Sequence, residues 1–315
     1  MIKTPICDLL GIEYPIFQGG MAWVADASLA AAVSNAGGLG IIAGMNSNGE
    51  QLRAEIRKCR ELTSKPFGVN VMLMSPYADE VAKVVVEEHV QVLTTGAGNP
   101  GKYMPEWLKA GIKVVPVVAS VSFARLAEKR GACAVVAEGA ESGGHIGKLH
   151  TMTLVPQICD AVRIPVLAAG GIADGRGIAA SFMLGAQGVQ VGTRFLVAKE
   201  CTISQIYKDK VVKAKDLDTI VTGEVLGDAV RSLKTSFSRE FQKKERSTEI
   251  NKEELEKFGS GALRRAAREG DDKNGCFLAG ESAGLVKKEQ TAKEIIEEMF
   301  SEAENLLGGA SKWVK

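Results

Sequence analysis

The loop that contains His145 carries the clearest chemical signal in the sequence. The chain has three histidines, and this one directly follows Gly143 and Gly144. An imidazole titrates near neutral pH, so a histidine on an open loop can exchange a proton with a molecule bound beside it. A lone histidine is more often structural than catalytic, but a histidine on a glycine loop can reach a bound molecule. The pattern therefore favours a catalytic role for His145.

Two further glycine-containing runs could cradle an anion. Gly170 and Gly171 form one run, and Gly192 with Thr193 forms the other. Glycine lets backbone N–H groups approach a phosphate, a helix N-terminus adds a favourable dipole, and the threonine hydroxyl adds a donor. The two runs predict a phosphate site, although glycines that only form tight turns would produce the same pattern.

Two polar residues interrupt apolar runs. Asn70 lies within one such run and Glu138 at the end of another. A buried amide or carboxylate is costly unless it is hydrogen-bonded, so each residue needs a partner. For Asn70 the candidates are a neighbouring core polar group and the edge of a ligand's heterocycle. For Glu138 they are a ligand hydroxyl or ring N–H, and a lysine or arginine of the chain.

Eight short apolar runs must position these residues. Several are followed by segments with apolar residues at three- and four-residue spacing, which is typical of helices. Strands alternating with helices favour an α/β fold of the (β/α)8 TIM-barrel type, whose active site lies at the carboxyl ends of its strands. The alternative, a doubly wound open sheet, predicts a dinucleotide fingerprint that residues 18–22 lack. The expected strands are residues 15–17, 39–43, 67–73, 90–96, 113–119, 133–139, 165–171 and 188–195, and the expected helices are residues 28–36, 51–62, 77–88, 121–130 and 176–184.

The composition of the chain changes after the eighth expected strand. Residues 199–258 are rich in charge but keep an apolar framework. This predicts a smaller, mainly helical lid subdomain, residues 199–287, over a barrel of residues 1–198. In the last segment, residues 288–315, Ile295, Met299 and Leu306 form the apolar stripe of a helix. We expect that helix to return to the barrel.

Composition also argues against several classes of protein. A formal net charge of +1 argues against nucleic-acid binding, which normally needs a basic excess. No apolar run is long enough to span a membrane, and no signal-peptide pattern is visible, so we expect a cytoplasmic protein without a membrane partner. The six cysteines lie far apart, so no metal site is expected.

Four segments of the sequence resemble a known family. The chain is similar to the flavin-dependent enoyl-[acyl-carrier-protein] reductase II proteins, which are related to the nitronate monooxygenases, once called 2-nitropropane dioxygenases. The histidine loop is highly specific to this group, whereas the glycine phosphate loops are shared by many barrels. The likeness extends through residues 189–195, 221–223, 260–261 and 280–284. The four segments are residues 18–23 (QGGMAW), 68–71 (GVNV), 137–147 (AEGAESGGHIG) and 168–175 (AAGGIADG).

The resemblance implies an FMN cofactor and a set of residues around it. Gly20, Met21 and Ala22 would line the isoalloxazine ring, while Asn70 and Glu138 would hydrogen-bond the flavin ring or ribityl chain. His145 corresponds to the catalytic histidine that has been proposed for the family. The ribityl chain and phosphate would be surrounded by Gly143, Gly144, Gly170, Gly171, Gly192 and Thr193.

The resemblance also implies a reaction. NADH or NADPH delivers hydride to FMN, and the reduced flavin passes hydride to the β-carbon of a trans-2-enoyl thioester carried by an acyl carrier protein. His145 would then protonate the α-carbon or hydrogen-bond the thioester carbonyl. A homodimer is possible. An acidic carrier needs a basic surface, and the densest cationic run is Arg231, Lys234, Arg239, Lys243, Lys244 and Arg246, although a solvated helix face would have the same composition.

Three other functions compete with this interpretation. A nitronate monooxygenase would use the same FMN and the same histidine, with O2 reacting at the reduced flavin. A dehydrogenase of the inosine-monophosphate type would need a cysteine on the loop after the sixth strand, where this chain has His145 and no cysteine. A flavin or phosphate sensor that recruits a partner through its charged lid would be non-catalytic.

Overall fold

Eight parallel strands form the central sheet of the computed structural model, which describes residues 2–44, 47–247 and 251–313. Each strand lies within or beside a run expected from the sequence, because continuous apolar runs suit a sheet that is covered outside by helices and filled inside by side chains. The strands are β1 (Ile16–Gln18), β2 (Gly40–Ala43), β3 (Phe67–Met72), β4 (Val92–Gly96), β5 (Lys113–Val118), β6 (Val135–Glu138), β8 (Val166–Ala169) and β9 (Gly188–Val191).

The sheet closes on itself into a barrel. Its strand order is β1-β9-β8-β6-β5-β4-β3-β2, and a parallel bridge between Phe17 and Leu39 joins the two ends. The predicted TIM barrel with a smaller, mainly helical C-terminal part is therefore confirmed, and the doubly wound sheet is excluded. Because all eight strands are parallel, their carboxyl ends meet at one mouth.

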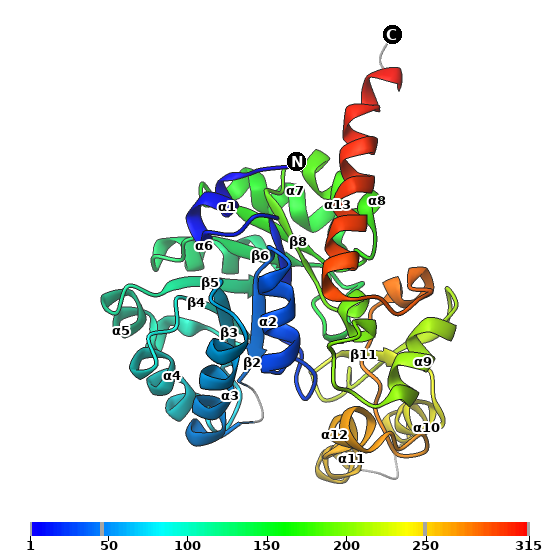
Figure 1. Ribbon diagram of the computed structural model, residues 1–315. Helices are drawn as coiled ribbons and strands as arrows, with labels where there is room; N and C mark the ends of the chain where they lie inside the picture. The colour runs from blue at the N-terminus through cyan, green and yellow to red at the C-terminus, as the bar shows by residue number, and fades with distance from the viewer. Residues whose placement is uncertain (1, 45–46, 248–250, 314–315) are drawn as a thin grey trace.

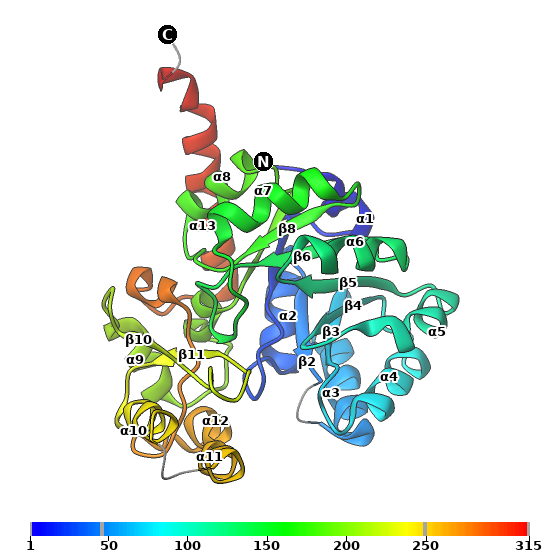
Figure 2. The same cartoon turned by 180° about the vertical axis from the view of Figure 1, so that it is seen from behind.

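Helices cover the outside of the barrel (Figures 1 and 2). Most of them begin at a side-chain cap. Asp26 accepts a hydrogen bond from Leu29 N–H, and Asn48 and Gln51 form a reciprocal capping box. The five helices expected from periodicity are present, whereas α5 and α7 were not expected. The helices are α2 (Ala27–Asn35), α3 (Gly49–Leu62), α4 (Ala78–Glu87), α5 (Met104–Lys109), α6 (Val121–Lys129), α7 (Thr151–Ala161) and α8 (Gly175–Met183).

A short helix closes the bottom of the barrel. Helix α1 (Pro5–Leu10) buries Ile6 and Leu10 in one cluster with inward-facing strand residues such as Phe17 and Val115. This end of the barrel is filled with apolar side chains, so among the described residues the opposite mouth is the open end of the barrel.

The described part of residues 199–287, the segment predicted as a lid and called the lid below, lies beside that mouth (Figure 1). Beyond the expected helices it contains a three-stranded sheet in the order β10-β11-β7. Strand β7 (Gly144–His145) comes from the barrel's histidine loop and pairs with the lid strand β11. The barrel and the lid therefore share a sheet at the histidine. The remaining lid elements are β10 (Thr219–Thr222), β11 (Val230–Leu233), α9 (Gln205–Lys213), α10 (Ser236–Glu245), α11 (Lys252–Gly259), α12 (Ala262–Arg264), a π-helix at Arg265–Glu269 and a 3₁₀-helix at Glu281–Leu285.

The last long helix returns to the barrel. Helix α13 (Ala292–Gly308) packs against α8 and α2 through buried residues that include Ile295, Met299 and Phe300. Leu306 is only partly buried, because the end of the helix extends past the barrel (Figure 1). Among the described residues, no helix is both long and apolar enough to cross a membrane.

Candidate functional site

A cavity of about 260 Å³ lies at the mouth of the barrel, between the strand ends and the lid. The strand ends supply its floor, and α9, α12 and residues 278–282 supply part of its cover. Every residue predicted for the site lines this cavity. These residues are Gly20, Met21, Ala22, Asn70, Glu138, Gly143, Gly144, His145, Gly170, Gly171, Gly192 and Thr193.

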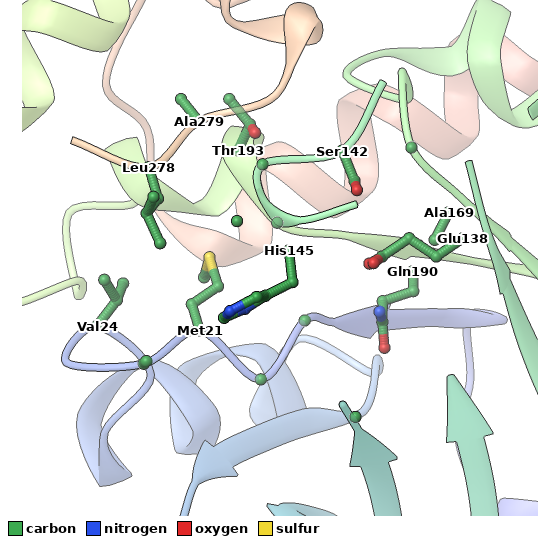
Figure 3. Close-up of a pocket in the computed structure, with 18 of the residues that line it drawn as sticks. Met21, Val24, Glu138, Ser142, His145, Ala169, Gln190, Thr193, Leu278 and Ala279 are labelled. Carbon is green, nitrogen blue, oxygen red and sulfur yellow. The ribbon is translucent and has the colours of Figure 1, made fainter. Parts of the chain in front are cut away.

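One side of the cavity is polar. Glu138, Ser142 and Gln190 point into it from β6, the histidine loop and β9 (Figure 3). Ser142 Oγ and Gln190 Oε1 are buried and have no hydrogen-bond partner within the described parts of the chain. Since buried polar atoms are nearly always paired, these two atoms indicate a polar ligand. Neither residue was singled out from the sequence, although Gln190 is a polar interruption of a strand, the same signal that identified Asn70.

Glu138 occupies an environment without a cation. Burial raises the pKa of its carboxyl from 4.5 to about 7. A lysine or arginine close by would have lowered the pKa instead. The Ser142 hydroxyl beside Glu138 partly offsets the rise in pKa, and no basic side chain of the described residues does so. Of the two kinds of partner expected for Glu138, the described residues therefore do not supply the basic side chain, and a hydroxyl or N–H remains.

Asn70 has a partner within the protein. Its Oδ1 accepts a hydrogen bond from Thr94 Oγ1 on the neighbouring strand, at 3.0 Å. The Asn70 side chain also explains why residue 20 is a glycine. A Cβ at position 20 would lie 2.3 Å from the Asn70 Cβ. This glycine is required by the close approach of the two segments, whether or not a ligand is present.

The two predicted phosphate loops differ in what their glycines do. Gly170 has φ +96°, and a Cβ there would lie 2.8 Å from the Gly139 carbonyl oxygen, so the turn itself requires glycine. Gly192 has an ordinary φ of −108°, and a Cβ there would meet only Met21, at 3.5 Å. The absence of a side chain at position 192 is not needed by the fold, and it leaves the cavity open at that point.

Thr193 is already engaged by the lid. Its Oγ1 accepts a hydrogen bond of 2.9 Å from Gly280 N–H, and the residue is buried. A hydroxyl that accepts one bond can still donate its own hydrogen. The predicted donor is therefore compatible with the structure, and the same side chain also ties the barrel to the lid.

His145 lies between the polar side and an apolar side of the cavity (Figure 3). Its Nε2 is 3.1 Å from Asp228 Oδ2, a contact between the histidine loop and the lid. Asp228 follows no sequence pattern that would have identified it, because 83 residues separate the pair. A histidine that lines the cavity could exchange a proton with a bound molecule. Its catalytic role stays a prediction.

The other side of the cavity is apolar. Met21, Val24 and Leu278 gather there (Figure 3). Leu263 and Tyr207 of the lid also line the cavity, and Tyr207 is held in place because its hydroxyl donates to the Leu278 carbonyl oxygen at 2.6 Å. The cavity can therefore accept a ligand with a polar part and an apolar part.

The structure corrects the predicted cationic surface at Arg231. This residue is buried. Its guanidinium donates to the Ala140 carbonyl oxygen at 3.1 to 3.2 Å, donates to Thr219 Oγ1 and pairs with Glu281 at 3.0 Å. Arg231 therefore fastens the lid to the histidine loop and is not available to a protein partner.

The remaining members of the cationic run lie nearer the surface. Lys234 donates to the Leu217 carbonyl oxygen, and Lys244 pairs with Glu240 at 3.6 Å. The exposed members of the run are Lys234, Arg239, Lys243 and Arg246.

The chain matches a known protein family and is similar to solved structures over its full length. A family model described as nitronate monooxygenase matches residues 3–88 and 75–302. Among solved structures, FabK from Thermotoga maritima is 49% identical, covers 100% of both chains and has a TM-score of 0.97.

Two curated relatives are similar over most of the chain. A (3aS,4S,5R,7aS)-5-hydroxy-7a-methyl-1-oxo-octahydro-1H-indene-4-carboxyl-CoA dehydrogenase of Mycobacterium tuberculosis is 39% identical over 239 residues, which are 75% of this chain and 67% of the relative. A probable nitronate monooxygenase of Staphylococcus aureus is 38% identical over 289 residues, which cover 77% and 81% of the two chains.

Proposed function

Because the chain belongs to the nitronate monooxygenase family, whose members are oxidoreductases, we propose that it is an FMN-dependent enoyl-[acyl-carrier-protein] reductase that uses NADH or NADPH. The observation that carries the proposal is the full-length similarity to FabK, a reductase of this type. The mycobacterial relative is named as a carboxyl-CoA dehydrogenase, an enzyme that acts on a thioester. The chain itself is an oxidoreductase.

The residues of the cavity fit FMN. Ser142 Oγ and Gln190 Oε1 are buried polar atoms that need a partner among the groups of a ligand. Glu138, without a cation beside it, suits a ribityl hydroxyl or a flavin N–H. Gly192 and Thr193 would hold the phosphate, because one leaves space and the other has a hydroxyl hydrogen to donate. FMN, when bound, supplies the hydride transfer between the nicotinamide donor and the enoyl thioester.

His145 supplies the proton chemistry in this proposal. Reduction of the double bond adds a hydride at the β-carbon and a proton at the α-carbon, so a proton donor must lie beside the substrate. His145 lines the cavity between its polar and apolar sides, which suits it to donate that proton or to hydrogen-bond the thioester carbonyl as negative charge develops.

The apolar side of the cavity suits the acyl chain. Val24, Leu263 and Leu278 line it, and burying a hydrocarbon chain against them is favourable, at about 0.8 kcal/mol for each CH₂ group. The acyl carrier protein itself would dock on the outside of the lid, where Arg239, Lys243 and Arg246 are exposed. Opposite charges on the two proteins would speed and orient their encounter.

Nitronate oxidation is the second candidate function. The family model and the staphylococcal relative carry that name, and His145 could remove a proton from a nitroalkane instead of donating one. The two activities differ in their consumption of oxygen. A nitronate monooxygenase consumes O2 with its substrate, whereas an enoyl reductase consumes NAD(P)H with an enoyl thioester.

A steady-state assay distinguishes the two candidates. Purified holoenzyme is supplied with NADH or NADPH and crotonyl thioester in one cuvette, and with a propyl nitronate in an oxygen electrode. The proposal predicts thioester-dependent NAD(P)H oxidation and little nitronate-dependent O2 uptake. Rapid nitronate-dependent O2 uptake without thioester reduction would replace the proposal with the second candidate.

A further inference from the structure

The lid supplies a carboxylate to the histidine of the barrel. Asp228 Oδ2 lies 3.1 Å from His145 Nε2, and the two side chains are 48% and 40% exposed. A carboxylate accepts hydrogen bonds and cannot donate them. For this contact to be a hydrogen bond, the histidine must carry a hydrogen on Nε2.

The turn that presents Asp228 is fixed by a second carboxylate. Glu245, at the end of α10, accepts hydrogen bonds from Gly223 N–H at 3.1 Å and from Val225 N–H at 2.9 Å. Asp228 N–H closes the same turn by donating to the Gly223 carbonyl oxygen at 3.1 Å. Three hydrogen bonds therefore restrain the backbone on which the Asp228 side chain is mounted.

The backbone of His145 is fixed to the same turn. Val230 is the residue opposite His145 in the antiparallel pair of β11 and β7, and Ile146 N–H donates to the Ala229 carbonyl oxygen at 2.9 Å. Both partners of the side-chain contact are thus held by neighbouring backbone hydrogen bonds. The arrangement places Nε2 against the lid, and no hydrogen bond among the described residues engages Nδ1.

We propose that Asp228 is a positioning residue, which holds His145 as the Nε2–H tautomer and makes Nδ1 the nitrogen that exchanges a proton with the substrate. The proposal rests on the proposed function for its kinetic consequence. A carboxylate beside an imidazole selects the tautomer and the ring orientation by accepting from one nitrogen. Asp228 acts through His145 and is assigned no contact with the substrate.

The tautomer can be measured without any substrate. Holoenzyme labelled with 15N-histidine contains three imidazoles, and His145→Ala identifies the signal of His145. Long-range 15N–1H correlation spectra recorded above the imidazole titration distinguish the two neutral forms. The proposal predicts an Nε2–H tautomer for His145 in the unmodified enzyme, and a mixture of both tautomers in Asp228→Asn, because an asparagine side chain can either accept or donate.

The effect of Asp228 on catalysis is tested by kinetics, with a matched control variant. Asp228→Asn is expected to lower kcat by at least about tenfold with little change in KM, since a wrong tautomer impairs proton transfer more than binding. Glu224 is exposed on the same turn, so Glu224→Gln removes the same charge and should leave both tautomer and kcat unchanged. Retained flavin absorbance verifies that each variant is folded.

Two results would overturn the proposal. One is an Nδ1–H tautomer in the unmodified enzyme, a measurement that depends on no variant. The other is an Asp228→Asn enzyme whose tautomer or kcat matches that of Glu224→Gln. If the unmodified enzyme shows the Nε2–H form and reduces no enoyl thioester, the positioning of His145 is supported and the proposed function alone fails.

Discussion

Thr193 Oγ1 accepts a hydrogen bond from Gly280 N–H at 2.9 Å, and this contact joins the loop after the last barrel strand to the lid. The threonine belongs to the predicted phosphate loop, and Gly280 precedes a 3₁₀-helix, Glu281–Leu285, whose Ser282 also lines the cavity. A ligand that receives the Thr193 hydrogen would therefore bind to a residue that also holds the lid in place. Cofactor binding and lid stability are expected to change together.

Thr193→Val tests this coupling. Valine has nearly the same shape but no oxygen, so Gly280 N–H loses its buried partner, at a cost of about 1–3 kcal/mol. We expect a lower unfolding temperature and roughly tenfold weaker FMN binding, measured by flavin fluorescence titration. Thr193→Ser keeps the hydroxyl and should resemble the unmodified protein. Unchanged FMN affinity in the valine variant would remove Thr193 from the cofactor site.

His145→Ala tests the proton donor. The side chain is at the cavity surface and not in the core, so we expect the variant to fold and to keep FMN. Its rate of enoyl reduction should fall by roughly 10²-fold or more. His150→Ala, which changes an exposed residue near the same loop, should have normal turnover. Full activity of the His145→Ala enzyme would refute the catalytic role.

Glu138 should make the stability of the apoprotein depend on pH. Burial raises its pKa from 4.5 to about 7, so the folded apoprotein favours the protonated carboxyl. This contribution to stability is complete below pH 4.5 and is lost as the pH rises through about 7. Glu138→Gln cannot ionise, and its unfolding temperature should fall less between about pH 5 and about pH 8.

The control for Glu138 is Glu106→Gln, a change at an exposed glutamate of α5. The unfolding temperature of this variant should depend on pH in the same way as that of the unmodified apoprotein. If the unfolding temperatures of the Glu138 and Glu106 variants depend on pH in the same way, the Glu138 carboxyl is not protonated in the folded apoprotein at neutral pH.

Charge reversal tests the carrier-protein surface. Arg239→Glu, Lys243→Glu and Arg246→Glu, combined in one variant, should raise KM about tenfold for an enoyl group on an acidic carrier protein, because the attraction is replaced by repulsion. The KM for a small enoyl thioester should not change. A control with Lys109→Glu, Arg125→Glu and Lys129→Glu on α5 and α6, all exposed, should affect neither substrate. Equal effects of the two variants on the carrier-linked substrate would place the carrier elsewhere.

The barrel could be predicted from the sequence because each strand is marked by a run of neighbouring apolar residues. Continuous apolar runs identified all eight strands, and residues at the carboxyl ends of all but β2 line one cavity. Helix α7 was not expected, since it contains Pro156 and follows a glycine-rich loop. Both features normally argue against a helix.

The lid's contribution to the site could not be predicted in the same way. Strand β7 has two residues, and its partner β11 lies far away along the chain, so neither carries a hairpin pattern. The Asp228 contact depends on that pairing. Arg231 was grouped with surface cations because of its charged neighbours, whereas its position in β11 buries it against the histidine loop.

Anaerobic flavin titration tests the central claim most directly. Holoenzyme is mixed with NADH or NADPH in the absence of oxygen, and the flavin absorbance is followed before and after crotonyl thioester is added. The account predicts that the reduced nicotinamide bleaches the flavin and that the thioester restores its colour. A flavin that NAD(P)H does not bleach, or that the thioester does not reoxidise, would contradict it.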